Sequence, residues 1–279
     1  MTSYHDTPLL KPPVWTWEIP LYFFVGGAGG AAAVLAAAAR AGGAEDSVVR
    51  DARWIAAAGA TLSAPLLISD LGRPERFLNM LRVFKPQSPM SVGAWTLAAF
   101  GGLSAAAAVA GARPSRATLP VRLAADVAGL GSASAGLVMA TYTGVLVGVS
   151  AIPVWKTHVR LLPVHFGASS LGAASSILEL RGHRHFALNA LALGAAVFET
   201  AAAVALETGD DRASRPLRAG RSGMMTRVAS ALSGPVPLAL RLLGARRGAA
   251  ASAILGSVLT RFAWVEAGKA SANDVQAAL

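Results

Sequence analysis

Long apolar segments separated by short arginine-bearing breaks dominate this sequence. The first segment, residues 20–39, reads PLYFFVGGAGGAAAVLAAAA and contains no charged side chain. An α-helix needs about 20 predominantly apolar residues to cross a hydrocarbon core of roughly 30 Å, so this segment is a candidate transmembrane helix. A chain built mostly from such segments has little soluble body, and its chemistry must lie within the bilayer or at its faces.

The composition indicates an all-α integral membrane protein. Of the 279 residues, 54% are hydrophobic and 14% are charged, whereas soluble domains carry about 25% charged residues. A membrane β-barrel would need strands that alternate apolar and polar residues, and the apolar segments here are continuous. Cysteine is absent, so we expect no disulfide, no thiolate metal site and no iron–sulfur cluster within the chain.

Eight membrane spans are predicted, and they form one integral membrane domain over residues 1–279. A division of the eight helices into two four-helix halves is also possible. The predicted spans are residues 20–39, 53–71, 91–111, 123–149, 159–180, 186–206, 228–243 and 249–265. The seventh span is the shortest and contains Pro235 and Pro237, and the eighth contains Arg261. The polar tail that ends at Lys11 lacks a basic region followed by a cleavage site, so no cleavable signal peptide is expected.

Glycine and alanine dominate the spans, and small residues let helix backbones approach closely in a membrane. Gly26 and Gly30 form one GxxxG pair, and Gly144 and Gly148 form another. Close helix packing is the expected role of both pairs. The GGAGG run near residue 28 is not interpreted as a dinucleotide-binding motif, because no strand precedes it.

Helix parity collects several polar and aromatic residues at one end of the predicted bundle. With eight spans, both termini and the connections after spans two, four and six share one membrane face, which we call the terminal face. The residues expected there are Glu18, Tyr22, Asp70, Arg73, Tyr142, Trp155 and His158. They come from sequence positions far apart, so their convergence indicates a functional site.

The net charge of +10 resides largely in arginines between the spans, where membrane proteins keep the charge that sets their topology. It therefore does not indicate nucleic-acid binding. Arginines in the short loops of the opposite face are typical of cytoplasmic loops, so the terminal face is expected to be the outer one. The terminal face also carries basic residues such as Arg82 and Lys85, so the difference between the faces is small.

Each of the site candidates has a structural and a functional interpretation. Asp70 and Arg73, in the sequence ISDLGRPERF, stand three apart and would lie side by side on a helical turn. They would form either an ion pair that ends the helix or a polar wall beside a ligand. Glu18 adjoins the first apolar residues and needs water or a partner. The hydroxyl of Tyr142 would bond either to a neighbouring helix or to a ligand.

Three acidic residues lie within or at the ends of spans four, five and six: Asp126, Glu179 and Glu199. Acids inside a membrane are typical of proton relays, and Glu199 is about 20 Å along its predicted helix. We hypothesise a proton path through them from the opposite face; the alternative is that each is protonated or paired with an arginine. His165 is the one histidine well inside a span and has no evident partner, so neither haem nor a metal site is expected.

Several motifs recur in a fixed order along the chain. They are WTWEIPLYFFVGG at 15–27, ISDLGRPERF at 68–77, SPMSVGAW at 88–95, TYTG at 141–144 followed by IPVW at 152–155, and RFAWVEAGKASAND at 261–274. Together they resemble the NrfD-like, polysulfide-reductase-type membrane subunits over nearly the whole chain.

The resemblance implies an eight-helix bundle that exchanges electrons with a membrane quinone, either menaquinone or ubiquinone. It also implies two partners: a ferredoxin-like subunit with four iron–sulfur clusters, and a molybdenum or tungsten bis-pterin (molybdopterin-type) enzyme that acts on formate, polysulfide, thiosulfate or a related substrate. The absence of cysteine fits, because the clusters would belong to the partner. The family precedent places the quinone site near the outer face of the bacterial inner membrane.

The resemblance also suggests residue roles. Tyr142 matches a tyrosine near the quinone head group, and Tyr22 falls where some members carry a histidine. Ile19 falls where some members carry an asparagine, and Glu18, one position earlier, is expected to replace that polar contact. The DLGRP pattern is common in one branch of the family and missing in others.

The expected mechanism places a quinone near Tyr22, Asp70 and Tyr142, with proton donors within hydrogen-bond reach. The candidate catalytic residues are Tyr142, Asp70 and Glu18, and the candidate cofactor-binding residues are Tyr22, Tyr142, Asp70, Arg73, Trp155 and His158. The competing interpretations are a transporter, which should show broken helices and repeat symmetry, and a passive membrane anchor, which would not need this polar cluster.

Overall fold

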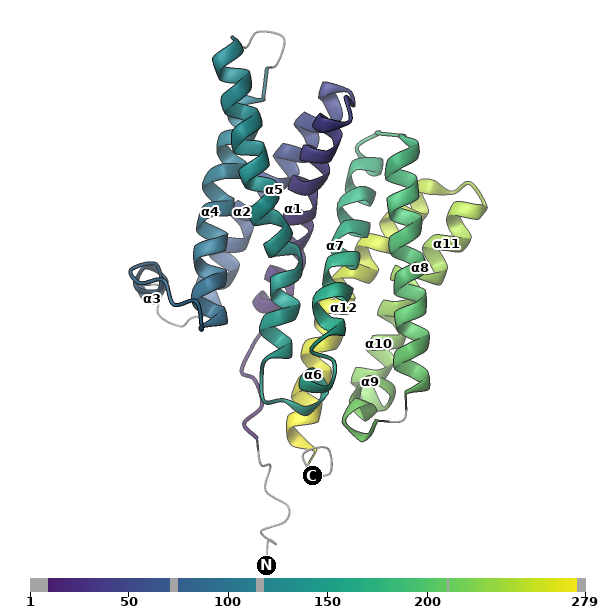
Figure 1. The fold of residues 1–279 in the computed structure, drawn as a ribbon. Coiled ribbons are helices and arrows are strands. Elements are labelled where there is room, and N and C mark those ends of the chain that lie inside the picture. The colour runs from purple at the N-terminus through teal and green to yellow at the C-terminus, as the bar shows by residue number, and fades with distance from the viewer. Residues whose placement is uncertain (1–9, 71–74, 114–117, 210, 275–279) are drawn as a thin grey trace, which may run out of the picture.

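The structure is a computed structural model that describes residues 10–70, 75–113, 118–209 and 211–274, and these ranges contain helices and no strands (Figure 1). The long helices are α1 (Glu18–Ala41), α2 (Asp46–Asp70), α4 (Pro89–Ala110), α5 (Leu119–Gly148), α7 (Leu161–Leu180), α8 (Phe186–Thr208) and α12 (Arg246–Asn273). The shorter ones are α3 (Glu75–Met80), α6 (Pro153–Thr157), η3 (Arg212–Ser214), α9 (Arg215–Arg218), α10 (Gly220–Ser233) and α11 (Pro235–Leu242).

Six helices in the described ranges are long and apolar enough to cross a membrane, namely α1, α4, α5, α7, α8 and α12. They correspond to six of the predicted spans and establish a multi-pass integral membrane protein. The total of eight spans remains a prediction, because the other two segments differ from what the sequence indicated.

Helix α2 begins at Asp46, earlier than the predicted start at residue 53. Its first turns carry Arg50, Asp51 and Arg53 as well, which lowers the apolar content of the helix. These charges are tolerated inside a helix because they form ion pairs with charged side chains around them. Arg53 is therefore a buried residue of α2, 8% exposed, and not part of a loop.

The predicted seventh span, residues 228–243, is not one helix. Helix α10 starts earlier, at Gly220, and the chain breaks at Gly234 before α11 begins at Pro235. A proline has no backbone N–H to continue a helix but is well suited to start one. The break therefore follows from Pro235 directly after a glycine.

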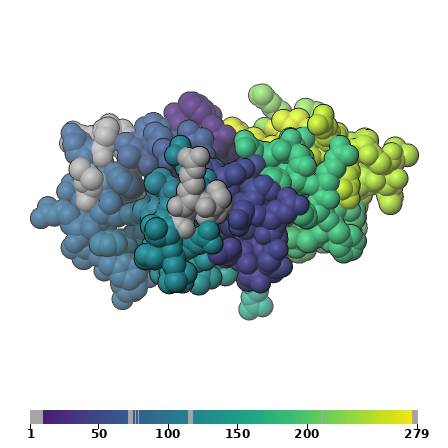
Figure 2. Space-filling model, turned by 90° about the horizontal axis from the view of Figure 1, so that it is seen from above, coloured from purple at the N-terminus to yellow at the C-terminus, as the bar shows by residue number. Residues whose placement is uncertain are grey.

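The long helices form two groups that lie side by side (Figures 1 and 2). The first half consists of α1, α2, α4 and α5, and the second half consists of α7, α8, α12 and the α10–α11 pair. Helices α1 and α5 pack against α7, and α12 also reaches α1, so the two halves share a central seam. Both ends of the described chain lie at the end of the bundle that carries α3, α6 and α9, as helix parity predicts (Figure 1).

Small residues allow close approach of α1 to α2 and α5. A Cβ added to Gly30 would collide with the carbonyl oxygen of Gly136 on α5, and one added to Gly29 would lie 2.9 Å from the Cα of Gly59 on α2. The expected packing role is thus confirmed for Gly30, whose helix lies backbone against backbone on α5.

The Gly30→Ala substitution is expected to lower the free energy of unfolding by about 1–3 kcal/mol, because the added methyl group forces α1 away from α5. Thermal unfolding in detergent measures the effect. Gly102→Ala in α4 is the matched control, since a Cβ there meets nothing within 4 Å. An unchanged melting temperature for Gly30→Ala would contradict the close packing.

Candidate functional site

Tyr142 on α5 is held against the start of α4 at the terminal face. Its hydroxyl donates a hydrogen bond of 2.5 Å to the carbonyl oxygen of Pro89. Its ring covers Gly93 so closely that a Cβ at that position would overlap the ring. The side chain is buried, at 6% exposure. Tyr142 is therefore fixed by two residues of the SPMSVGAW motif, which sequence reasoning identified as a motif without assigning a role to either residue.

The local structure of that motif explains why α4 begins where it does. Ser88 caps the helix by accepting a hydrogen bond from the N–H of Ser91, and Pro89 occupies the first turn. The Ser91 hydroxyl oxygen accepts a 3.0 Å bond from the N–H of Lys85, which ties the preceding loop to the helix. The Pro89 carbonyl is thereby presented to α5 at a fixed position.

Tyr22 on α1 lies next to Tyr142 in the first half. It is 2% exposed, and its helix packs against α5, which carries Tyr142. One turn further along α1, Gly26 packs against Met139, which precedes Tyr142 by about one turn of α5. Within the described ranges, no hydrogen bond joins the Tyr22 hydroxyl to another residue. This hydroxyl is thus a donor beside Tyr142 that a ligand could use.

Two carboxylates meet at the rim just outside the tyrosines. The Thr16 hydroxyl lies between them, bonded to the Glu18 carboxylate and 3.3 Å from Oδ1 of Asp70. The Thr16 N–H also points at Oδ1 of Asp70, at 3.5 Å. Glu18 and Tyr22 are four residues apart on α1 and so share a helix face. The structure therefore brings Glu18, Asp70 and Tyr22 to one end, with Thr16 as an unpredicted bridge.

Arg73, the fourth polar candidate, lies outside the described residues, so the proposed ion pair with Asp70 stays a prediction. Asp70 is the last residue of α2, so it lies at the end of a helix as the sequence indicated.

Trp155 and His158 occupy the seam between the halves. The Trp155 N–H donates a 2.8 Å bond to the carbonyl oxygen of Trp264, and its ring stacks on Trp15 with centroids 5.4 Å apart. His158 Nδ1 lies 2.9 Å from the Val154 carbonyl oxygen, and its ring meets Trp264 edge to face. Their hydrogen bonds within the described ranges are made to backbone atoms of the chain. No described contact joins them to the tyrosines, but Trp155 anchors the segment that positions Thr16.

Five cavities among the described residues are lined by residues other than Tyr22, Asp70 and Tyr142. The case for a ligand at this end therefore rests on the chemistry and convergence of the side chains.

A second polar cluster is buried in the second half. His165 Nε2 lies 2.9 Å from Oε2 of Glu199, and the Ser233 hydroxyl donates a 3.0 Å bond to the same oxygen. The Trp264 N–H points at His165 Nδ1, at 3.3 Å. All these side chains are at most 5% exposed. The expectation that His165 has no partner is wrong, because Glu199 on the neighbouring helix faces it.

Arg261 adds a fully buried cation to this cluster. Its Nη2 donates to the Phe166 carbonyl oxygen and to the Ser170 hydroxyl, both at 2.9 Å, and its guanidinium lies 4.4 Å from the Phe166 ring centroid. Within the described ranges, Nε and Nη1 of Arg261 and Oε1 of Glu199 have no hydrogen-bond partner. Unsatisfied charged atoms inside a membrane protein are costly and tend to mark function.

The three acids of the hypothesised proton path are not bonded to one another within the described ranges. Asp126 accepts bonds from Arg40 and Arg53, and Glu179 accepts a 2.6 Å bond from Arg241. These pairs match the arginine-pairing alternative. Glu199 pairs with a histidine instead, so it differs from the other two in being able to share a proton with its partner.

A model of the polysulphide reductase NrfD family matches residues 6–207. The chain belongs to the NrfD family. No curated protein matches it at a significant level. The matched range contains Tyr22, Tyr142, His165 and Glu199, and it ends before Arg261 and the rest of α10–α12. The NrfD-like resemblance inferred from the motifs is thereby confirmed.

The Glu199→Ala substitution is expected to lower the free energy of unfolding by about 3–5 kcal/mol, because it leaves His165 and Arg261 buried without their carboxylate. Chemical or thermal unfolding in detergent measures the loss. Glu207→Ala is the control: Glu207 lies on the same helix but pairs with Arg227 at the surface, so a much smaller loss is expected. Equal losses for the two variants would show that the buried pair contributes no more than the exposed one.

Proposed function

We propose that this NrfD-family chain is the quinone-reactive membrane subunit of a multi-subunit oxidoreductase. In this role it passes electrons between a menaquinone or ubiquinone pool and a separate iron–sulfur subunit. The observation that carries the proposal is that Tyr22 and Tyr142 lie on the packed helices α1 and α5, while Thr16 joins Glu18 at the start of α1 to Asp70 at the end of α2. Family membership supports the same function.

The side chains at this end suit the chemistry of quinone interconversion, which couples two electrons to two protons. Tyrosine hydroxyls orient a carbonyl oxygen by donating hydrogen bonds to it. Tyr142 would exchange the Pro89 carbonyl for a ligand oxygen, and the Tyr22 hydroxyl would donate to the same ligand. Glu18 and Asp70 are partly exposed at the rim, so they would exchange protons between the tyrosines and water.

The proposed partners rest on the family to which the chain belongs, and the composition of the sequence agrees with them. With no cysteine in its sequence, the chain needs a separate protein to hold iron–sulfur clusters. A ferredoxin-like four-cluster subunit would dock on the terminal face, beside Thr16 and Asp70. A molybdopterin-type enzyme for formate, polysulfide or thiosulfate would lie beyond it. In this arrangement the terminal face is the outer face of a bacterial inner membrane.

Removing the proposed ligand contacts should slow quinone turnover. Tyr142→Phe keeps the ring on Gly93 and deletes the hydroxyl, and Asp70→Asn deletes the rim acid. Each is expected to lower the rate by about 100-fold in the assembled complex, because a positioned proton donor contributes roughly that factor. Thr141→Val is the control, since the Thr141 hydroxyl bonds only to its own helix. Unchanged rates in correctly assembled complex would refute the assignment.

A second role for the chain is proton movement through the second half. We propose that Glu199 and His165 exchange a proton during turnover, with Asp126 and Glu179 as the acids nearest the opposite face. The supporting observation is that Glu199 is buried beside a titratable partner and retains one oxygen with no partner in the described ranges. Ser233, which donates a hydrogen bond to Glu199, directly precedes the helix break at Gly234. The backbone beside the cluster is therefore not helical at this point.

Glu199→Gln is expected to abolish proton uptake from the opposite face while quinone binding persists, because glutamine keeps the shape and cannot carry a proton. Proton uptake by the assembled complex in vesicles provides the measurement. Glu207→Gln, on the same helix at the surface, serves as the control. Unaltered uptake in Glu199→Gln would remove this role.

The competing functions are a transporter and a passive anchor. The helix break at Gly234 and the two-half arrangement are features that transporters share. Purification of the chain with its neighbours separates the cases: bound quinone and a cysteine-rich partner support the redox function, and their absence supports the others.

A further inference from the structure

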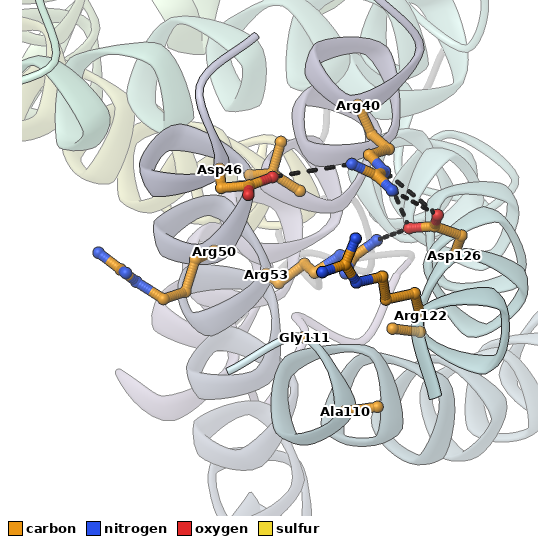
Figure 3. A pocket seen from close by; sticks show the side chains of 10 residues that line it. Arg40, Asp46, Arg50, Arg53, Ala110, Gly111, Arg122 and Asp126 are labelled. Carbon is orange, nitrogen blue, oxygen red and sulfur yellow. Dashed lines mark hydrogen bonds and ion pairs between the residues drawn. The ribbon is translucent and has the colours of Figure 1, made fainter. Parts of the chain in front are cut away.

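A small arginine-rich pocket lies at the end of the first half opposite the tyrosines (Figure 3). The end of α1, the start of α2, the end of α4 and the start of α5 form it around a cavity of about 50 Å³. The charged side chains that line this arginine pocket are Arg40, Arg50, Arg53, Arg122, Asp46 and Asp126. Four cations thus face two carboxylates.

The two carboxylates do not neutralise the pocket. Arg40 pairs with Asp126 at 3.0 Å and with Asp46 at 3.7 Å, and Arg53 shares Asp126 at 2.8 Å. Arg122 makes no ion pair within the described ranges and is exposed. Arg50 extends away from the centre of the pocket in Figure 3. Its Nε lies 3.7 Å from Oδ1 of Asp51, a residue that does not line the pocket. The pocket therefore holds a net positive charge, to which Arg122 contributes without an ion pair in the described ranges.

Arg53 is held in place with unused hydrogen-bonding capacity. Its side chain is 9% exposed, and its Nε has no hydrogen-bond partner within the described ranges. Two glycines make room for the guanidinium: a Cβ at Gly111 would lie 2.5 Å from Nη1, and one at Gly129 would lie 3.1 Å from Nη2. A buried donor without an acceptor costs free energy, so an anion in the pocket would stabilise the arrangement.

The backbone adds to the positive potential. The first turn of α2 contributes Asp46 and Val49 to the lining, and α2 is 25 residues long. The N-terminus of such a helix carries partial positive charge that attracts anions, and here the N–H groups of Val48 and Val49 already donate to the Glu45 carbonyl oxygen.

We propose that the arginine pocket binds a phosphate group, supplied by an anionic phospholipid of the adjacent leaflet. Arginine matches phosphate oxygens with two parallel donors, and basic pockets between membrane helices accept anionic lipid headgroups. Val49 and Ala125 form the buried apolar part of the lining, and the partly exposed Ala110 lies where the glycerol and acyl part of a lipid would leave the pocket.

Native mass spectrometry of the purified complex, with phosphatidylglycerol added to detergent micelles, tests the proposal. The wild type is expected to retain one phosphatidylglycerol in preference to phosphatidylcholine. Arg122→Gln is expected to weaken retention about tenfold, because it removes a charge-assisted contact and leaves the exposed rim otherwise intact. Arg113→Gln is the matched control: it lies at the same end, carries the same charge and does not line the pocket.

One further variant, Arg122→Lys, guards against loss of folding. Arg122→Lys keeps the charge but not the paired donors, so it should retain lipid between the wild type and Arg122→Gln. Equal phosphatidylglycerol retention by the wild type and Arg122→Gln would overturn the proposal, as would equal weakening by Arg113→Gln.

Inorganic phosphate distinguishes the source of the anion. If phosphate in lipid-poor detergent raises the melting temperature of the wild type and not of Arg122→Gln, while phosphatidylglycerol is not retained, the pocket binds a soluble phosphate and the lipid assignment is wrong. Retention of phosphatidylglycerol without competition from phosphate supports the lipid. Neither result bears on quinone turnover, so this proposal stands or falls separately from the proposed function.

Discussion

Backbone contact between α1 and its neighbours is the constraint on which the rest of the molecule depends. In a membrane no hydrophobic effect drives helices together, so association relies on close packing. Gly29 and Gly30 let α1 lie directly on α2 and α5, and α1 also packs against α7 of the second half. Because α1 is so closely held, Tyr22 and Glu18 on its first turns have fixed positions relative to Asp70 and Tyr142. The arrangement of the candidate site therefore depends on the packing of α1 against α2 and α5.

Charges inside the bundle are arranged differently in the two halves. In the first half the buried arginine, Arg53, lies near one end and shares a carboxylate with Arg40. In the second half Glu199, His165 and Arg261 lie within the core, where hydration cannot offset their burial. The first arrangement suits attraction of an anion from outside the chain, and the second suits a proton that stays within it. The two halves thus place their buried charges at different depths.

Much of the architecture was predictable from the sequence because hydrocarbon imposes a simple length and composition rule. Six helices, the shared end of both termini and the family follow from apolar segments, parity and local motifs. The early start of α2, the break at Gly234 and the pair formed by His165 and Glu199 did not follow. The start of α2 and the His165–Glu199 pair depend on contacts between distant residues, which leave no periodic signal, whereas the break at Gly234 has a local cause in Pro235 that apolar content alone does not reveal. Thr16 was not predicted as part of the site, because its contact with Asp70 joins residues 54 positions apart and a threonine before a helix has many ordinary roles.

The stack of Trp15 on Trp155 gives the N-terminal segment a place in both halves of the bundle. Trp155 is fastened to α12 through the Trp264 carbonyl, while Thr16, the next residue after Trp15, touches Asp70 at the end of α2. Trp15 and Thr16 therefore connect the two halves of the bundle across the seam. Sliding of one half against the other would move this segment and draw the Thr16 hydroxyl away from Glu18 and Asp70, so the hydrogen bonds at the rim depend on the alignment of the two halves.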